Sequence, residues 1–422
     1  MKTLFFDFVV ECCRAVWFNS ANFPKTEVGS GKSGAPVQTL ENLEMKKTLV
    51  AIAALAAFGA QAQSSVTIDG IMDAGYQAIN YKGNSVTGFQ GNGSSTSQIN
   101  FRGTEDLGGG LKANFRVESD WSTVSNGFNQ GAKSTPLAAA TAGSYAAAND
   151  GTLNNGGSFG NGELLVGLTG GFGAVHFGAI NQNGLTAIAL GQPYGTALGG
   201  GYGSVIRVNA AGSAVREDQS FRYSTPTFAG FAGTFLKSNK QTKAVDSTTV
   251  QQTSFSTSLG AYDKQGVQEI GVTYANGPLA ANYNTAKFDS KSVGTGTTES
   301  TVNTLAAAYT MGAAKFMFLN QTNKTDTNSI DTAYTSVAAS YTMGQTVLSA
   351  NVGGLKSKAG TSNGKKSDII GLGADYNLSK TTALYARYES IDDKAGVIAA
   401  AATIDGTDTK RTRTALGVRV GF

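Results

Sequence analysis

The chain has 422 residues, among them 55 glycines, 6 prolines and one histidine, and only 15% of its residues are charged. Soluble globular domains carry about 25% charged residues, so this composition argues against an ordinary soluble protein. The 33 basic and 29 acidic residues are too balanced to indicate nucleic-acid binding. Two adjacent cysteines, Cys12 and Cys13, and the single His176 exclude most thiolate and histidine metal sites, so we expect no metal or cofactor.

A secretory signal is predicted well inside the chain, starting at Met45. A basic start at 45–47 is followed by an apolar run at 49–58 and a small-residue cleavage site at 60–62. The apolar run is shorter than the ~20 residues that a membrane-spanning helix needs. We therefore expect residues 45–62 to be a signal peptide and residues 63–422 to form the exported protein.

Residues 1–44 lie upstream of this signal, which already has all of its parts. A working signal would not easily tolerate such an extension. We interpret it as an upstream mis-start of the reading frame, with a genuine but removed extension as the alternative. Neither interpretation gives Cys12 or Cys13 a role.

From residue 66 onward, the chain repeats segments in which apolar and polar residues alternate. In the first of them, Val66 and Ile68 alternate with Thr67 and Asp69. A period of two predicts strands with one apolar face. Sixteen such segments are predicted, at 66–80, 98–105, 111–121, 163–169, 174–180, 218–224, 231–237, 267–274, 279–288, 302–309, 314–321, 334–341, 346–355, 368–376, 383–391 and 410–422.

The connections between these segments alternate in length. Short glycine-rich turns are followed by eight long polar loops, at 81–97, 122–161, 181–217, 238–266, 289–301, 322–333, 356–367 and 392–410. A soluble sandwich has no reason to sort its loops in this way. The segments are close to the ~9–11 residues of a tilted strand that crosses a bilayer, and an even number of strands can close without edges. The sequence therefore predicts a 16-stranded antiparallel transmembrane β-barrel.

The last segment shows most clearly which face meets lipid. Leu416, Val418 and Phe422 fall on one side, and Arg411 and Arg413 fall on the other. In a barrel, the apolar side faces lipid and the charged side faces a water-filled lumen. An ordinary amphipathic strand would fit this segment alone, but not the repetition along the chain.

Residues 101–113, F-R-G-T-E-D-L-G-G-G-L-K-A, resemble the second strand, turn and third strand of the Gram-negative general porins, particularly the betaproteobacterial branch. Val66-Thr67-Ile68, Val166-Gly167-Leu168, the stretch 223–231 and the terminal Phe422 support the resemblance, which covers the whole exported chain. It implies short periplasmic turns, long extracellular loops and a third loop that folds inward. It also implies a homotrimer in the outer membrane.

The resemblance further implies the partners of the chain. The terminal aromatic Phe422 looks like the signal through which the outer-membrane assembly machinery recognises the last strand. Outer-membrane lipids and lipopolysaccharide would surround the barrel. Small hydrophilic solutes and ions would pass through it.

The chemistry of such a channel lies in its charged constriction. The third long loop carries Arg207 and Arg216 and no acid before Glu217. The residues predicted to line the pore or its constriction are Arg102, Lys112, Arg116, Arg207, Arg216, Arg222, Glu118 and Asp218. Strand parity also places Arg387, Arg411, Arg413 and Arg419, with the acids Asp69, Asp73, Asp375 and Glu389, in the lumen.

Unpaired arginines behind an acid-free loop would favour anions. The alternative is that they pair with nearby acids and only stabilise the wall. The chain also has Gln98 and Ala179 where related porins often carry arginines, which would weaken a cationic path. The sequence therefore predicts a passive, water-filled channel for small hydrophilic solutes and ions, with a weak preference for anions.

Other functions are less consistent with the sequence. A substrate-specific channel, or an adhesin using the low-complexity loop 122–161, stays open as an alternative. A barrel enzyme would need His176 as its base, but parity places His176 in the lumen of the fifth strand, away from any motif-like serine. We therefore do not expect catalysis.

Overall fold

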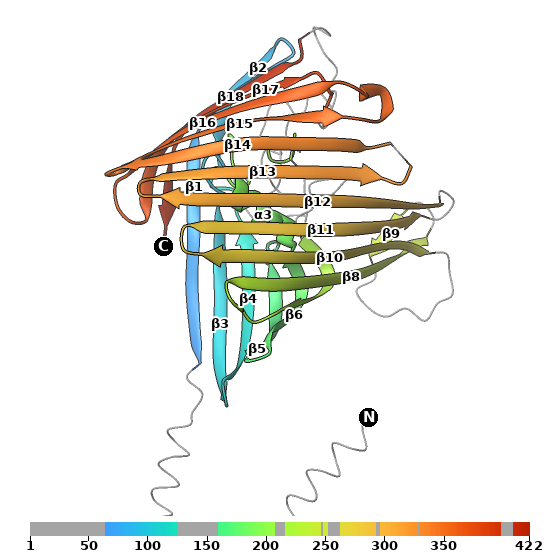
Figure 1. Cartoon of the computed structure of the whole chain (residues 1–422). Coiled ribbons are helices and arrows are strands. Elements are labelled where there is room, and N and C mark those ends of the chain that lie inside the picture. Colours follow the sequence, from blue (N-terminus) through green and yellow to red (C-terminus); the bar gives the residue numbers. More distant parts are fainter. Residues whose placement is uncertain are drawn as a thin grey trace, which may run out of the picture. The chain divides into compact units, whose positions relative to one another are not determined.

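The computed structural model describes residues 64–124, 159–206, 216–245, 248–251, 262–292, 296–327, 329–397 and 408–422. In these residues the chain is built almost entirely from strands (Figure 1). The expected upstream segment 1–44 and signal peptide 45–62 lie outside the described residues.

Sixteen strands of the described chain form a closed antiparallel barrel, as predicted. They are β1 (Ser65–Tyr81), β3 (Gln98–Gly108), β4 (Leu111–Asp120), β5 (Leu164–Gly170), β6 (Gly173–Asn181), β7 (Arg216–Ser224), β8 (Phe231–Val245), β10 (Tyr262–Asn276), β11 (Leu279–Ser292), β12 (Gly296–Met311), β13 (Ala314–Thr325), β14 (Asp331–Met343), β15 (Thr346–Ser357), β16 (Lys366–Asn377), β17 (Thr382–Asp393) and β18 (Lys410–Gly421). Two short strands, β2 (Asn84–Gln90) and β9 (Thr248–Gln251), extend β1 and β8 as hairpins.

The first and last strands close the ring. β18 pairs with β1 from Ile71↔Gly421 to Tyr81↔Arg411, and the other edge of β1 pairs with β3. Each barrel strand therefore has a neighbour on both sides, so its backbone N–H and C=O groups are satisfied without water. Lipid imposes that condition on any spanning structure.

Tight turns join the strands at one rim. Gly312 and Gly344 lie in two-residue hairpin turns with φ values of 59° and 57°. This left-handed conformation costs glycine least, and it matches the twist of the two strands that it joins. The sorting of short turns to one rim and long loops to the other is as the sequence predicts.

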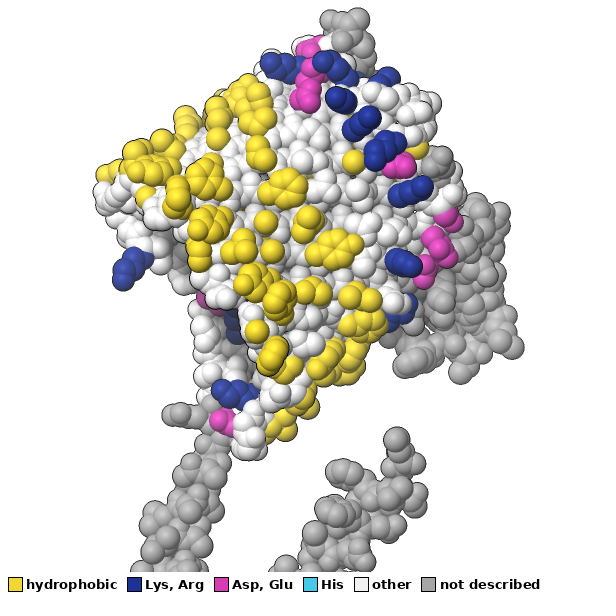
Figure 2. Space-filling view, viewed as in Figure 1, with side chains coloured by type: hydrophobic (Ala, Val, Ile, Leu, Met, Phe, Trp, Pro, Cys, Tyr) yellow, Lys and Arg dark blue, Asp and Glu magenta, His cyan; other side chains and the backbone are white. Residues whose placement is uncertain are grey.

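The outer face of the barrel carries a band of apolar side chains (Figure 2). Side chains that alternate along neighbouring strands form it, for example Ile270, Val272, Leu305, Phe316, Val337 and Val352, all of them exposed. Lys and Arg side chains gather beyond one edge of this band, on the side of the long loops (Figure 2). An exposed apolar belt of this kind is what a lipid-embedded barrel needs.

Several strands continue farther toward the long loops than the sequence pattern indicates. β8 was predicted at 231–237 and ends at Val245, and β10 was predicted from 267 and begins at Tyr262. The sequence of these extensions is mainly polar, so the apolar alternation that marks a strand is lost there. The hydrogen-bonded ladder itself continues, for example between Thr242 and Asp263.

The third long loop folds into the barrel, as the resemblance implies. It contains the helix α3 (Asn183–Gly191), which contacts β11, β12 and β13. The helix residues Ala187 and Ile188 pack against Ala306 and Leu319, and all four side chains are fully buried. In the rest of this article the described part of the loop, residues 182–206, is called loop L3. Of the helices in the described residues, none is long and apolar enough to cross a membrane.

Candidate functional site

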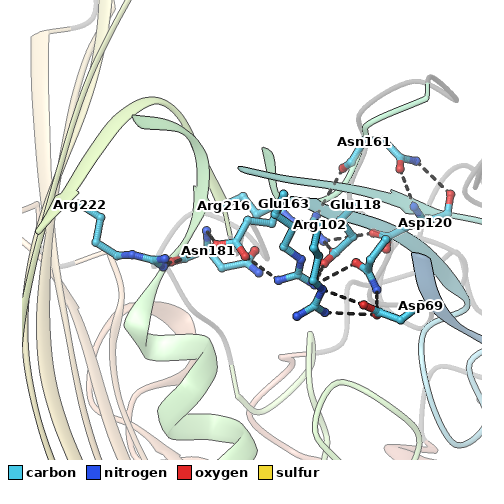
Figure 3. A network of polar contacts seen from close by, with 11 residues as sticks. Asp69, Arg102, Glu118, Asp120, Asn161, Glu163, Asn181, Arg216 and Arg222 are labelled. Carbon is cyan, nitrogen blue, oxygen red and sulfur yellow. Dashed lines mark hydrogen bonds and ion pairs between the residues drawn. The ribbon is translucent and has the colours of Figure 1, made fainter. Parts of the chain in front are cut away.

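A network of ion pairs lies on the wall formed by β1 and β3–β7, and it contains most of the predicted constriction residues (Figure 3). Arg116 on β4 is at its centre. Its Nη1 lies 2.6 Å from Oε2 of Glu163, its Nη2 contacts Glu118, and it donates a 3.0 Å hydrogen bond to Asn100.

Two arginines of β7 join the same network. Nη2 of Arg216 lies 2.8 Å from Oε1 of Glu118 and 3.1 Å from Oδ2 of Asp120. Nη1 of Arg222 lies 3.5 Å from Oε1 of Glu163 and donates to the backbone oxygen of Asn181.

Arg102 on β3, in register with Arg116, extends the network toward β1. Its Nε lies 2.9 Å from Oδ2 of Asp69, and Asn100 donates a 2.8 Å hydrogen bond to the same carboxylate. We call the arginines Arg102, Arg116, Arg216 and Arg222, with the acids Asp69, Glu118, Asp120 and Glu163, the arginine cluster. Its four positive and four negative formal charges cancel.

Outside the Arg102–Asp69 pair, in which the acid is itself 35% exposed, the two signs of charge in the arginine cluster differ in exposure. The side chain of Arg102 is 48% exposed, and those of Arg116 and Arg222 are 21% and 23% exposed. The acids that pair with Arg116, Arg216 and Arg222 are only 4–6% exposed. The guanidinium groups therefore lie between these carboxylates and the water.

These contacts answer one question left open by the sequence, whether the arginines are paired with acids. Each described arginine of the predicted constriction has an acidic partner, so the expectation of uncompensated guanidinium groups is wrong for them. Arg387 also pairs with Asp375, at 2.8 Å. Arg207 lies outside the described residues.

Lys112 and Asp218 occupy other surroundings. Lys112 is exposed at the short-turn end of β4, in register with Asp106. Near Asp218, a register shift and a positive φ at Gln219 insert an extra residue into β7 and interrupt the alternation. As a result, parity fails there, and Glu217 is the buried carboxylate that accepts a 2.8 Å hydrogen bond from Gln182 of loop L3.

Sequence reasoning missed Glu163 as a member of the cluster and Glu269 as a support of loop L3. Parity could have found both. Glu163 lies on the same face of its strand as Leu165, opposite the exposed Val166, and Glu269 alternates with the exposed Ile270.

Two buried acids of the barrel wall hold loop L3 in place. Glu269 on β10 accepts hydrogen bonds from the N–H groups of Asn183 (2.6 Å) and Gly184 (2.8 Å), at the start of α3. The positive end of the helix dipole favours a carboxylate at this position. Glu389 on β17 accepts the N–H groups of Gly199 and Gly201, at 3.2 and 3.0 Å.

Glu389 is also paired with two buried arginines of β18. Its Oε1 lies 3.0 Å from Nη2 of Arg411 and 2.7 Å from Nη2 of Arg413. These side chains are 0% and 3% exposed, and that of Glu389 is 0% exposed. We call Glu389, Arg411 and Arg413 the locking cluster, because it joins loop L3 to the closing strand.

Tyrosines of loop L3 complete its attachment. The hydroxyl of Tyr194 donates to the backbone oxygen of Ser349, at 2.9 Å, and the Arg387 guanidinium lies over its ring. Burial raises the pKa of the Tyr194 and Tyr202 hydroxyls, so both stay neutral over the physiological pH range.

The described residues contain no group of three or more His, Cys, Asp or Glu side chains that could hold a metal ion. His176 on β6 has its Nε2 2.9 Å from Oδ1 of Asn114, on the neighbouring wall.

Comparison with known proteins identifies the family. Residues 48–396 match the family model of the Gram-negative porins. The chain belongs to this family. An outer membrane porin protein of Delftia acidovorans is 32% identical over 368 residues, covering 83% of this chain and 90% of that protein. One of Bordetella pertussis is 29% identical over 398 residues, covering 81% and 93%.

Solved porin structures share the fold. An anion-selective porin from Comamonas acidovorans has a TM-score of 0.61 and 25% identity, covering 85% of this porin and 100% of that chain. OmpT of Vibrio cholerae, folded in vitro, has a TM-score of 0.56 at 17% identity, which is a likeness of fold alone. The porin is thus an outer-membrane β-barrel that belongs among channels rather than enzymes.

Proposed function

We propose that this porin is a general diffusion channel for small hydrophilic solutes and ions, with a weak preference for anions. The preference rests on one observation, the difference in exposure within the arginine cluster. Arg102, Arg116 and Arg222 meet the water, while the acids that pair with Arg116 and Arg222 are buried behind them.

This layering of charge determines which ions the pore favours. Arginine keeps its charge at any physiological pH. A low-dielectric wall around a narrow column of water strengthens the field of the charges nearest to the ion. Since the formal charges of the cluster cancel, the preference is weak. The description of the Comamonas acidovorans relative as anion-selective supports the same direction.

The test is the reversal potential of the purified porin in a planar bilayer under a KCl gradient. We expect a potential on the anion-selective side near 0.1 M, where the Debye length is ~10 Å. The preference should fade toward 1 M, where that length is ~3 Å. A cation-selective potential at low salt would contradict the proposal.

Assembly is the second part of the proposal, with a homotrimer as the final state and Phe422 as the insertion signal. The backbone of Phe422 exchanges two hydrogen bonds with Gly70, at 3.0 and 3.1 Å, and its exposed ring lies against that glycine. Deleting Phe422 should reduce insertion in cells, while Phe422→Tyr should preserve it. Insertion of the deletion variant at the wild-type level would contradict this role.

Export through the signal at 45–62 is the third part. The exported protein should begin at Gln63 and should lack both cysteines. Mass spectrometry of protein from outer membranes measures this directly. Peptides from residues 1–44 in the inserted protein would contradict the mis-start interpretation.

The last part is the lack of enzymatic activity. The contact of His176 with Asn114 in the strand wall supports this, because a general base must reach a substrate proton. Refolded porin should give no esterase or protease turnover above that of a His176→Ala variant. Turnover that this substitution removes would contradict the inference.

A further inference from the structure

A cavity on the loop side of the barrel lies apart from the arginine cluster. It has a volume of about 230 Å³ and is bordered by the end of loop L3, by β13–β15 and by the segments that follow β15 and β17. In the order of the ring, β13–β15 face β4–β6 across the barrel. At about 30 Å³ for each water, the cavity has room for roughly eight waters, or for one molecule of monosaccharide size.

None of the described residues that line this cavity carries a charge. Its polar groups are hydroxyls and amides, among them Ser204, Asn323, Thr361 and Ser362. Its apolar part includes Val205 and Leu355. An ion would find no counter-charge in this lining, whereas a sugar has both a hydroxylated edge and an apolar C–H face.

One polar atom of the lining is left unsatisfied. The side chain of Asn323 is 6% exposed, and its Oδ1 has no hydrogen-bond partner among the described residues. A buried acceptor without a donor destabilises the structure, because it has lost its hydrogen bond to water. This oxygen is itself buried, so the Asn323 amide has to turn toward the cavity before a solute hydroxyl can donate to it and restore the lost hydrogen bond.

Hydrogen bonds keep the walls of the cavity in place without a ligand. Ser357 donates to the backbone oxygen of Ala359, and the N–H of Lys358 donates to the oxygen of Asp331 at 2.7 Å. On the opposite side, the N–H of Val397 donates to Asp393 at 2.6 Å, and Ser367 donates to the same carboxylate. The cavity is therefore formed before any solute arrives.

We infer that this cavity is a binding subsite for a neutral, polyhydroxylated solute of monosaccharide size, on the loop side of the pore. The inference rests on the proposed channel function and names a class of solute that the channel would hold briefly. Asn323 would accept a hydroxyl proton, and the apolar lining would contact the C–H face.

The experiment uses glucose as the neutral probe and gluconate as a charged probe of similar size. Ion current through single porin channels is recorded while glucose is added on the loop side. We expect a saturable decrease in current, half-maximal on the order of 10 mM, which is typical of weak binding. The decrease in current on addition of gluconate should not saturate in this concentration range.

Asn323→Leu removes the acceptor and should weaken the glucose effect at least tenfold. Asn320→Leu, on the polar outer face of the same strand, is the matched control and should bind as wild type. Thr361→Val, in the hairpin segment, is a second variant that should also weaken binding if Asn323→Leu does not fold. A decrease in current without saturation, equal saturation with gluconate, or unchanged binding in both cavity variants would overturn the inference. If wild-type porin forms no channel at all, the proposed function fails instead.

Discussion

The arginine cluster and the locking cluster are built from the same residue types but have different roles. In the arginine cluster, Arg102, Arg116 and Arg222 are 21–48% exposed. In the locking cluster, Arg411 and Arg413 are at most 3% exposed. The guanidinium groups of the first can act on ions in the pore, and those of the second can only stabilise the fold.

Exposure, rather than residue type or strand parity, therefore decides the role of a lumen arginine. Parity assigns Arg102 and Arg411 to the same inner surface. Loop L3 covers the wall that carries the locking cluster, and it leaves the wall that carries the arginine cluster open to water. What separates the two clusters is therefore the path of a loop, which the strand pattern does not contain.

The largest expected effect is on the locking cluster. Glu389→Gln leaves Arg411 and Arg413 buried without their shared carboxylate, and breaking a buried pair in this way costs ~3–5 kcal/mol. We expect a loss of this size in the free energy of unfolding, measured in urea in lipid vesicles.

Glu163→Gln is the matched control, because Glu163 also serves two arginines. Those arginines reach water, so the loss should stay below about 2 kcal/mol, as for a charged hydrogen bond. Equal losses in the two variants would break the comparison.

An intermediate effect is expected at the helix of loop L3. Glu269→Gln removes the charge that receives the N–H groups of Asn183 and Gly184. A carboxylate at a helix N-terminus contributes about 0.3–1 kcal/mol, up to ~2 when partly buried. We expect more frequent brief closures and greater current noise in single-channel recordings.

The control for this variant is Glu299→Gln, which makes the same change at an exposed position of β12. It should leave the current as quiet as in the wild type. The account of Glu269 as a support of loop L3 would be wrong if both variants were equally noisy.

The smallest effect is expected at Lys112. Its exposed side chain lies at the short-turn end of β4, so bulk water and salt screen its charge. Lys112→Gln should shift the reversal potential less than Arg116→Gln in the same KCl gradient. A larger shift for Lys112→Gln would mean that the selective region of the pore lies away from the arginine cluster.

The barrel could be predicted from the sequence because lipid and water impose opposite demands on alternate residues. Val66, Ile270 and Leu416 mark the lipid face wherever a strand crosses the membrane. The alternation is lost where the sequence is mainly polar, so the sequence predicts β8 and β10 to be shorter than they are at their loop-side ends.

The site could be predicted only in part. Strand parity correctly predicts that Arg116 and Glu118 lie on the same surface, but it does not predict the ion pair between them. At Asp218 the extra residue of a bulge broke parity, and nothing local in the sequence marks that position. The acids that hold loop L3 lie far from it in the chain, because Glu389 is 188 positions from Gly201 and Glu269 is 85 positions from Gly184, beyond any local pattern.

The most direct test of the central claim is the reversal potential of the triple variant Arg102→Gln, Arg116→Gln and Arg222→Gln in a KCl gradient near 0.1 M. A unit charge ~8 Å from an ion is worth ~2 kcal/mol at an effective dielectric of ~20, before screening by salt. Removing the three exposed guanidinium groups should leave the buried acids dominant and move the potential several-fold in permeability ratio toward cations. An unchanged potential would contradict the account, because it would mean that the ions do not pass close to the arginine cluster.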